Sequence, residues 1–229
     1  MGRMAVIVSF MSQKGGVGKS TLARALTAVA GYSGMRTRLV DLDPQQASVS
    51  EWERTREKNE AGPPCEVIAY ETADEAIGRS GDVELLIIDC PARIGPDTLE
   101  IAQRSHLVVQ PTGASADDLR PAVLTFHELV NAGVPRERLV AAVCRTLSET
   151  EEAAARAYMQ AAGYEVLAGS VPERSAYREA QNRGQAITET KFAKLNQRAD
   201  ALMEALLRKV TQELQARARA AREARKVHE

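Results

Sequence analysis

Aromatic residues are scarce in this 229-residue chain: Phe, Tyr and Trp make up 4% of it, against 44% for all hydrophobic residues. A buried core must therefore consist mainly of Val, Ile, Leu and Ala. A chain of this length still buries enough surface to fold as one domain. We expect a single domain over residues 1–229, in which a C-terminal helical segment over 190–229 packs with its first part and projects or frays with its last.

Cysteine and histidine are equally rare. The three cysteines, Cys65, Cys90 and Cys144, lie far apart without a CxxC spacing, which excludes a complete disulfide framework and gives no cysteine metal-site pattern. The three histidines stand alone, with no neighbouring acid or nucleophile motif. A reducing, cytoplasmic environment fits this usage.

Long apolar runs are absent too. No run approaches the roughly 20 residues that cross a bilayer. The chain passes from Met1-Gly2-Arg3 straight into a strand-like segment, without the pattern of a cleavable signal. We therefore expect a cytoplasmic protein.

Charge is distributed unevenly along the chain. Residues 174–229 carry 13 Lys and Arg against 7 Asp and Glu, a net charge of +6, whereas the preceding residues carry 17 against 24, a net of −7. Basic charge concentrated at one end suits a polyanionic partner.

What the chain does contain is an alternation of short apolar, β-branched runs with helical patterns. The predicted strands are Met4–Phe10, Thr37–Leu42, Glu66–Ala69, Leu85–Asp89, Leu107–Gln110, Leu139–Cys144 and Val166–Val171. The predicted helices are Lys19–Tyr32, Val49–Glu60, Ala73–Arg79, Thr98–Gln103, Asp117–Ala132, Thr150–Ala162, segments from Ala176 onwards, and Lys191–Arg225. This order predicts an α/β fold with a doubly wound, mostly parallel sheet flanked by helices, and a long basic C-terminal helix.

A glycine-rich loop follows the first strand and opens the first helix. It reads SQKGGVGKST over residues 12–21. Glycines let successive backbone N–H groups point into one concavity, and the helix N-terminus adds partial positive charge, so the loop is suited to phosphate oxygens. Lys19 can reach the β- and γ-phosphates, and the Ser20 hydroxyl can ligate Mg²⁺. The loop therefore predicts a P-loop NTPase that binds ATP with Mg²⁺.

The loop carries a second lysine, Lys14, and Gln13 replaces the first glycine of the general pattern. It fits the variant KGGxGK[ST] and resembles the deviant Walker A motif of the ParA/MinD ATPase family. Four further segments resemble that family in the same order: VDLDPQ from Val40, LLIIDCPA from Leu85, VVQPT from Val108, and SVPERSAYREAQNRGQAI from Ser170. The resemblance covers most of the chain and is closest to the short ParA/ParF-type partition ATPases.

The resemblance implies roles for individual residues. Lys14 is expected to reach phosphates bound by the other subunit of an ATP-dependent homodimer, and Lys19 to hold phosphates in its own subunit. Asp43 is expected to position water or assist hydrolysis. Ser20, Asp41 and Asp89 are the metal candidates, and Pro172 is an adenine-side contact. The nucleotide-binding candidates are Lys14, Gly15, Gly16, Val17, Gly18, Lys19, Ser20, Thr21 and Pro172.

In this family the ATP state controls adherence to DNA or to a membrane. A membrane-targeting helix needs bulky apolar residues opposite its basic face, and after Val210 the chain offers only Leu214 and Val227 among Ala and Arg. We therefore expect non-specific DNA binding through phosphate contacts. The candidate contacts are Arg183, Lys191, Lys194, Arg198, Arg208 and Lys209, supplemented by Arg217, Arg219, Arg222 and Arg225.

The expected function is a weak, Mg²⁺-dependent ATPase that segregates or positions a plasmid, a chromosome region or a protein cargo on the nucleoid. A ParB-like or other partner protein, together with DNA, is expected to stimulate hydrolysis. The phosphate loop starts only a dozen residues from Met1, so no helix-turn-helix domain for a specific operator is expected before it. Two alternatives stay open: a MinD-like membrane-cycling ATPase, and a nucleotide-controlled dimeric regulator with little turnover.

Overall fold

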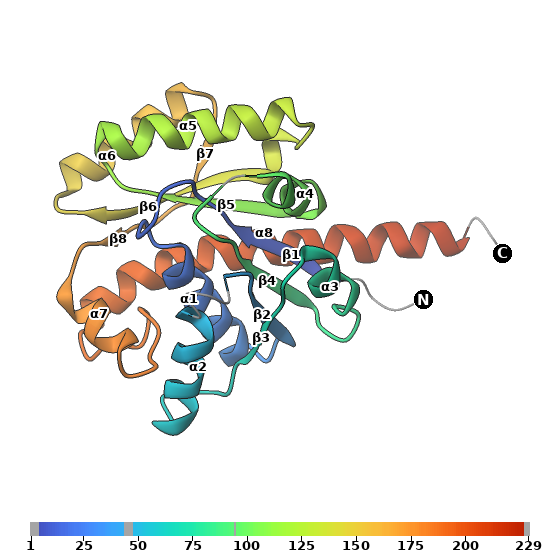
Figure 1. Cartoon of the computed structure of the whole chain (residues 1–229), viewed down its shortest axis with the longest axis horizontal. Coiled ribbons are helices and arrows are strands. Elements are labelled where there is room, and N and C mark those ends of the chain that lie inside the picture. Colours follow the sequence, from blue (N-terminus) through green and yellow to red (C-terminus); the bar gives the residue numbers. More distant parts are fainter. Residues whose placement is uncertain (1–4, 44–47, 94, 227–229) are drawn as a thin grey trace.

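The computed structural model describes residues 5–43, 48–93 and 95–226, with side chains to residue 223. The described residues form one parallel sheet with the strand order β3-β2-β4-β1-β5-β6-β7, and β8 pairs with β6 (Figure 1). The strands are β1 (Val6–Phe10), β2 (Thr37–Asp41), β3 (Glu66–Ala69), β4 (Leu85–Asp89), β5 (Leu107–Thr112), β6 (Leu139–Thr146), β7 (Glu165–Val166) and β8 (Val171–Pro172). The predicted α/β class and parallel sheet are confirmed.

Helices cover both faces of the sheet. They are α1 (Lys19–Tyr32), α2 (Ser48–Lys58), α3 (Ala73–Gly78), α4 (Pro96–Arg104), α5 (Ala116–Asn131), α6 (Glu149–Ala161), α7 (Ser175–Gln181) and α8 (Ala193–Lys226), with a 3-10 turn η1 at Arg136–Arg138. The face with α1, α2, α7 and α8 holds one hydrophobic cluster, and the face with α3 to α6 holds the other. Strands buried on both sides explain the nearly continuous apolar runs in the sequence.

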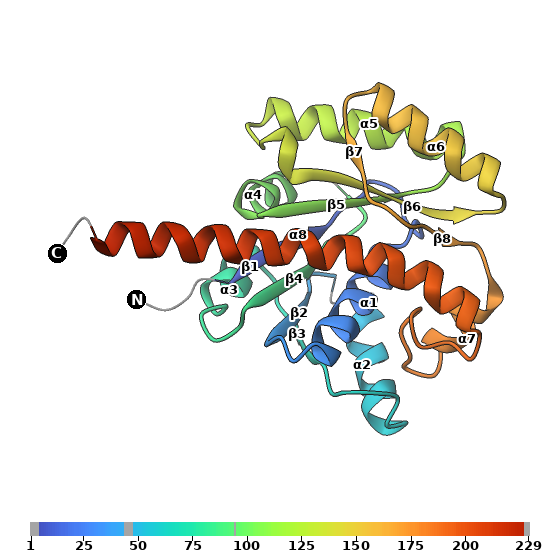
Figure 2. The same ribbon diagram turned by 180° about the vertical axis from the view of Figure 1, so that it is seen from behind.

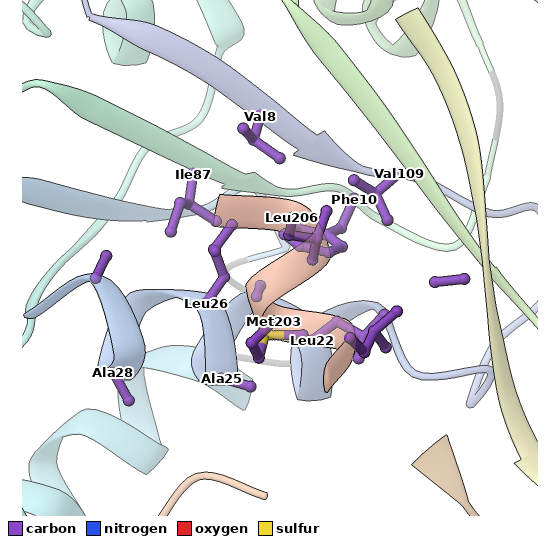
Figure 3. Close-up of a cluster of buried hydrophobic side chains, with 14 of the residues drawn as sticks. Val8, Phe10, Leu22, Ala25, Leu26, Ala28, Ile87, Val109, Met203 and Leu206 are labelled. Carbon is purple, nitrogen blue, oxygen red and sulfur yellow. The ribbon is translucent and has the colours of Figure 1, made fainter. Parts of the chain in front are cut away.

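The first cluster lies between α1, α8 and the central strands (Figure 3). Val8 and Phe10 of β1 point to this face because alternate residues of a strand share a side. They meet Leu22 and Leu26 of α1 and Leu206 of α8, which are all fully buried. Aliphatic side chains thus make most of the core, as the low aromatic content requires.

Helix α8 is one continuous helix of 34 residues that crosses the back of the sheet (Figure 2). Its first half buries Ala199, Leu202, Met203, Leu206 and Val210. Contact does not stop there, because Arg217 donates through Nη1 to the backbone carbonyl of Ala5 at 2.7 Å. The helix is therefore docked further along than its apolar stripe predicts, and exposed side chains follow from Arg219 to Glu223.

One predicted strand is wrong in detail. Instead of a single strand over Val166–Val171, the structure has β7 and β8, separated by a turn with Gly169 at φ +80°. Arg156 donates to the carbonyls of Leu167 and Gly169 and holds this turn. A Cβ at Gly169 would stand 2.5 Å from the Leu202 backbone nitrogen, so only glycine fits against α8. The predicted strand start at Met4 lies outside the described residues.

The strand order fixes where a ligand should bind. The chain leaves β1 through α1 toward β2, whereas β5 leads through α5 to β6 on the other side of β1. The carboxyl ends of β1 and β5 therefore flank a topological switch point, the usual ligand crevice of doubly wound sheets.

Candidate functional site

The glycine-rich loop lies at this switch point. Gly16 and Gly18 have positive φ values of +72° and +117°, which glycine adopts without steric cost. A Cβ on Gly18 would stand 3.5 Å from Cys144 Sγ, an ordinary van der Waals distance, so the loop lies against the end of β6. Helix α1 starts at Lys19 with no side-chain cap and no acidic residue in its first turn. No acidic side chain of its own first turn therefore neutralises the partial positive charge at the start of α1.

Lys19 is buried beside acidic groups. Burial lowers the pKa of Lys19, and the carboxylate of Asp89 opposes that shift most strongly. Burial raises the pKa of Asp89 to about 6, although the Ser20 hydroxyl and Lys19 favour its charged form. A buried ammonium group and a buried carboxylate need hydrogen-bonding partners in addition to each other.

The hydroxyl and carboxylate groups of three elements converge next to Lys19. Asp41 and Asp89 are register partners at the ends of β2 and β4. Ser48, at the start of α2, donates to Ser20 Oγ at 3.2 Å. Asp41 accepts through Oδ1 from the backbone N–H of Asp43 at 3.0 Å, and through Oδ2 from the Ser50 hydroxyl at 3.3 Å.

These groups differ in how well they are suited to bind a magnesium ion. Asp89 Oδ1 is buried without a hydrogen-bond partner, although the Asp89 side chain interacts with the Ser20 hydroxyl. Both oxygens of Asp41 already accept hydrogen bonds, so Asp41 is suited to orienting neighbours. Among the described residues, no three His, Cys, Asp or Glu side chains gather as a ready metal site. Mg²⁺ needs no such cluster, because it keeps waters and takes oxygens from substrate phosphates.

Asp43 lies beyond the end of β2, which stops at Asp41. The alternation of side chains along a strand therefore does not extend from Asp41 to Asp43. Its charge acts on the buried Lys19, so Asp43 lies near the phosphate-binding loop. The Pro44 and Gln45 of the same motif lie outside the described residues.

Lys14 contacts an acid of its own chain. Its ammonium group forms an ion pair with Asp118 Oδ1, near the start of α5. Burial opposes ionisation of Asp118, but hydrogen bonds from Lys14 and Ser115 outweigh it and hold the pKa of Asp118 below its ordinary value. The Lys14 side chain is 46% exposed, so it lies at the surface of the loop.

A cleft of about 280 Å³ opens beside the loop. One wall is the loop and the start of α1, and the other is formed by the end of β6, β8 and α7. Its lining residues are Gly16, Val17, Gly18, Thr21, Cys144, Arg145, Val171, Pro172, Glu173, Arg174, Tyr177, Arg178 and Gln181. The structure thus places Pro172 in the same cleft as the glycines, 154 positions or more away in sequence.

The basic candidates divide into two groups. Arg183, Lys191 and Lys194 are exposed around the junction of α7 and α8, and the first two border one small hollow. The other three have acidic neighbours: Arg198 pairs with Glu152 at 2.9 Å, Lys209 with Glu165 at 2.8 Å and Arg208 with Glu204 at 3.8 Å.

The four supplementary arginines differ in their surroundings. Arg217 is tied to Ala5 and lies 2.8 Å from His106 Nε2, so the expectation that it is available to a partner is wrong. The side chain of Arg225 lies outside the described part. Arg219 and Arg222 are exposed.

Several site residues were not predicted from sequence. Arg24 donates to the Ser48 carbonyl and to Gln181 Oε1, which also accepts from Thr21. Arg145 contacts the Gly16 carbonyl. The available signal was position alone: Arg145 lies at the carboxyl end of a predicted strand, the edge where ligands bind.

Together, the parallel sheet, the loop at its switch point and the Lys19–Ser20 helix start define a P-loop nucleotide-binding protein. The family model described as "CobQ/CobB/MinD/ParA nucleotide binding domain" matches residues 8–187. The chain belongs to this family of P-loop ATPases.

Solved structures show the same fold at low sequence identity. The septum site-determining protein MinD of Pyrococcus horikoshii, in complex with Mg-ADP, matches with a TM-score of 0.71 at 20% identity over 89% of this chain and 96% of that one. The ATP complex of a Cyanothece McdA variant gives 0.69 at 18% over 90% and 97%. A plasmid partition protein of Borrelia burgdorferi B31 bound to AMPPNP gives 0.65 at 17% over 90% and 100%.

In the parts of the chain that the structure describes, no helix combines the length and apolar character that a membrane crossing requires.

Proposed function

We propose that this chain is a ParA-like ATPase that binds Mg-ATP, dimerises with it and then binds DNA without sequence preference, in order to segregate or position a cargo on the nucleoid of the cytoplasm. The observation that carries the proposal is the pair of lysines in one phosphate loop. Lys19 is buried beside Asp89, whereas Lys14 is half-exposed and paired with Asp118 at the surface. One lysine therefore serves the nucleotide of its own subunit, and the other is available to a second subunit.

Each polar group of the site has a task in this proposal. The loop residues Gly15, Gly16, Val17 and Gly18, together with Thr21 in the first turn of α1, surround the phosphates, and Lys19 neutralises their charge. Ser20 and Asp89 hold Mg²⁺, which offsets charge on the phosphate oxygens. Asp41 orients the backbone of Asp43, whose carboxylate positions the attacking water. Phosphoryl transfer needs mainly such positioning and charge stabilisation.

The cleft next to the loop supports the site for the base and ribose. Pro172 lies in the wall opposite the glycines and offers an apolar surface to a flat base. The McdA and Borrelia structures contain ATP or an analogue in proteins of this fold, which supports the choice of nucleotide.

The surface that would bind DNA is the exposed junction of α7 and α8. Arg183, Lys191 and Lys194 carry no acidic partner in the described residues, unlike Arg198 and Lys209. Unpaired basic side chains bind phosphates without first breaking an ion pair, so these three are the strongest candidates. The exposed end of α8 offers Arg and Ala but no apolar face for insertion into lipid.

The test is binding of the purified chain to non-specific duplex DNA with ATP, ADP or no nucleotide, at two salt concentrations. Vesicles containing anionic lipid serve as the parallel surface, and Lys14→Ala as the matched variant. We expect DNA binding that requires ATP, weakens with salt and is lost in Lys14→Ala.

Other results would replace the proposal. Vesicle binding without DNA binding would indicate a membrane-cycling ATPase. ATP-dependent dimerisation with no surface binding and negligible turnover would indicate a nucleotide-controlled regulator. Failure to bind Mg-ATP would contradict all three functions.

A further inference from the structure

Arg145 has a left-handed backbone conformation, with φ at +58°, that residues other than glycine rarely adopt. It lies at an irregularity of β6, where the register with β8 shifts between Cys144 and Thr146. Such bulges re-aim a side chain, and a strained residue persists only where its surroundings hold it.

The bulge turns two consecutive side chains toward the phosphate loop. In a regular strand, neighbours point to opposite faces of the sheet. Here Cys144 packs against the position of Gly18, and Arg145 donates through Nη1 to the Gly16 carbonyl at 3.0 Å. The strained conformation therefore delivers the guanidinium to the loop.

The same guanidinium reaches the opposite wall of the cleft. Its Nε donates to Glu173 Oε2 at 3.0 Å, and Glu173 directly follows Pro172. Arg178 on α7 binds the other carboxylate oxygen of Glu173. Arg145 thus bridges the phosphate wall at Gly16 and the base wall at Glu173, and all four residues line the cleft.

We propose that Arg145 is a positioning residue that sets the separation of these two walls and thereby the affinity for nucleoside di- and triphosphates. The inference rests on the proposed function, because it assigns the cleft to the nucleotide. A planar guanidinium holds two acceptors in fixed geometry, so it keeps the cleft preorganised before the nucleotide arrives.

The experiment compares Arg145→Gly with Glu60→Gly. Glycine accepts the positive φ in both cases, so both variants are expected to fold. Glu60 has φ +47° and lies in the turn after α2, outside the cleft. Calorimetric titration with Mg-ADP should show affinity about tenfold weaker in Arg145→Gly, the loss expected for charge-assisted hydrogen bonds. Glu60→Gly should match the wild type.

Kinetics and a second substitution separate positioning from general damage. With saturating ATP, kcat of Arg145→Gly should stay within about twofold of the wild type while KM rises, as for a group that acts on binding alone. Glu173→Gln should weaken ADP binding, and its combination with Arg145→Gly should cost less than the product of the two single effects. Arg145→Lys, which keeps the charge without the fork, should be intermediate.

Each opposite result overturns the inference. Unchanged ADP affinity in Arg145→Gly, wild-type affinity in Arg145→Lys, or multiplicative effects with Glu173→Gln would show that no bridge acts on binding. Failure of the wild type to bind ADP or ATP would instead contradict the proposed function itself.

Discussion

At the scale of the residue, two anions compete for the ammonium group of Lys14. In the described chain its ammonium pairs with Asp118, whereas the proposed dimer needs it on phosphates of the second subunit. The pair is half-exposed on the lysine side, and exposed ion pairs contribute only about 0.2 to 1 kcal/mol. Asp118 therefore holds Lys14 weakly enough for a nucleotide to displace it.

Replacing Asp118 with Ala should favour the dimer. Two pairs are released per dimer, so the ATP-dependent dimerisation constant should strengthen between about 2-fold and 30-fold. Sedimentation of the protein at several concentrations with ATP measures this constant. Asp117→Ala is the control, because Asp117 is exposed in the same helical turn. Equal effects of the two variants would show that only helix charge has changed.

At Asp89, one carboxylate oxygen, Oδ1, is buried without a hydrogen-bond partner. Asp89→Asn removes a carboxylate whose pKa burial raises to about 6, so it should stabilise the nucleotide-free protein at pH 7 by up to about 3 kcal/mol, the cost of keeping that carboxylate ionised. The same change removes the metal-binding oxygen, so stabilisation by Mg-ADP should disappear. Thermal unfolding with and without Mg-ADP measures both effects.

Asp97→Asn, at an exposed position of α4, controls for the loss of one negative charge. An Asp89→Asn protein that is less stable than the wild type without nucleotide would contradict this account.

At the scale of the element, the distal half of α8 is held at the amino-terminal edge of the sheet. His106 accepts through Nδ1 from the backbone N–H of Ile7 at 2.9 Å, and its Nε2 lies 2.8 Å from Arg217 Nη1. Burial lowers the pKa of His106 to about 4, and the charges of Arg217 on α8 and Arg138 on η1 add to the shift. The imidazole is therefore neutral in the folded protein at pH 7.

This arrangement predicts loss of stability in acid. A histidine whose folded pKa lies below its unfolded value of 6.5 binds its proton more readily in the unfolded chain. Stability is therefore complete above pH 6.5 and falls as the pH drops toward 4. The shift corresponds to at most about 3 kcal/mol, reduced by solvent because the ring is partly exposed.

Urea unfolding across this pH range measures the effect. His106→Asn keeps an acceptor for Ile7 but does not titrate, so its stability should vary less between pH 6.5 and 4. His127→Asn is the matched control, because that second histidine is exposed on α5. Identical pH profiles for the wild type and His106→Asn would refute the assignment.

The sequence predicted most elements because their signals are local. Apolar runs marked β1, β2, β4, β5 and β6 within a few residues, and the glycine loop marked the start of α1. The split of β7 and β8 depends instead on Arg156 and on the close approach of α8 to Gly169. Such contacts between distant segments leave no periodic signal in the chain.

At the scale of the whole molecule, some residues of the site could be predicted from the sequence and others could not. The phosphate loop and Asp89 were recognisable because motif, strand and helix follow one another in sequence. Arg145, Glu173 and Asp118 were not predicted, because each acquires its partner only when the parallel sheet brings separate strand ends to one edge. Arg217 was misjudged for the same reason: its partner, Ala5, lies 212 positions away.

The final prediction concerns the assembled dimer on DNA. Within the described part of the chain, each subunit presents three exposed basic residues without an acidic partner at the α7–α8 junction: Arg183, Lys191 and Lys194. If two subunits together neutralise six phosphates, the logarithm of the binding constant should fall with the logarithm of salt concentration with a slope of about −5. Replacing all three by Gln should bring the slope close to zero.

The matched control replaces three exposed arginines away from the junction, Arg36, Arg79 and Arg120, by Gln. This control loses the same charge from the whole protein but no phosphate contact, so its slope should remain close to that of the wild type. Equal slopes for both triple variants would show that net charge, rather than the α7–α8 junction, governs binding.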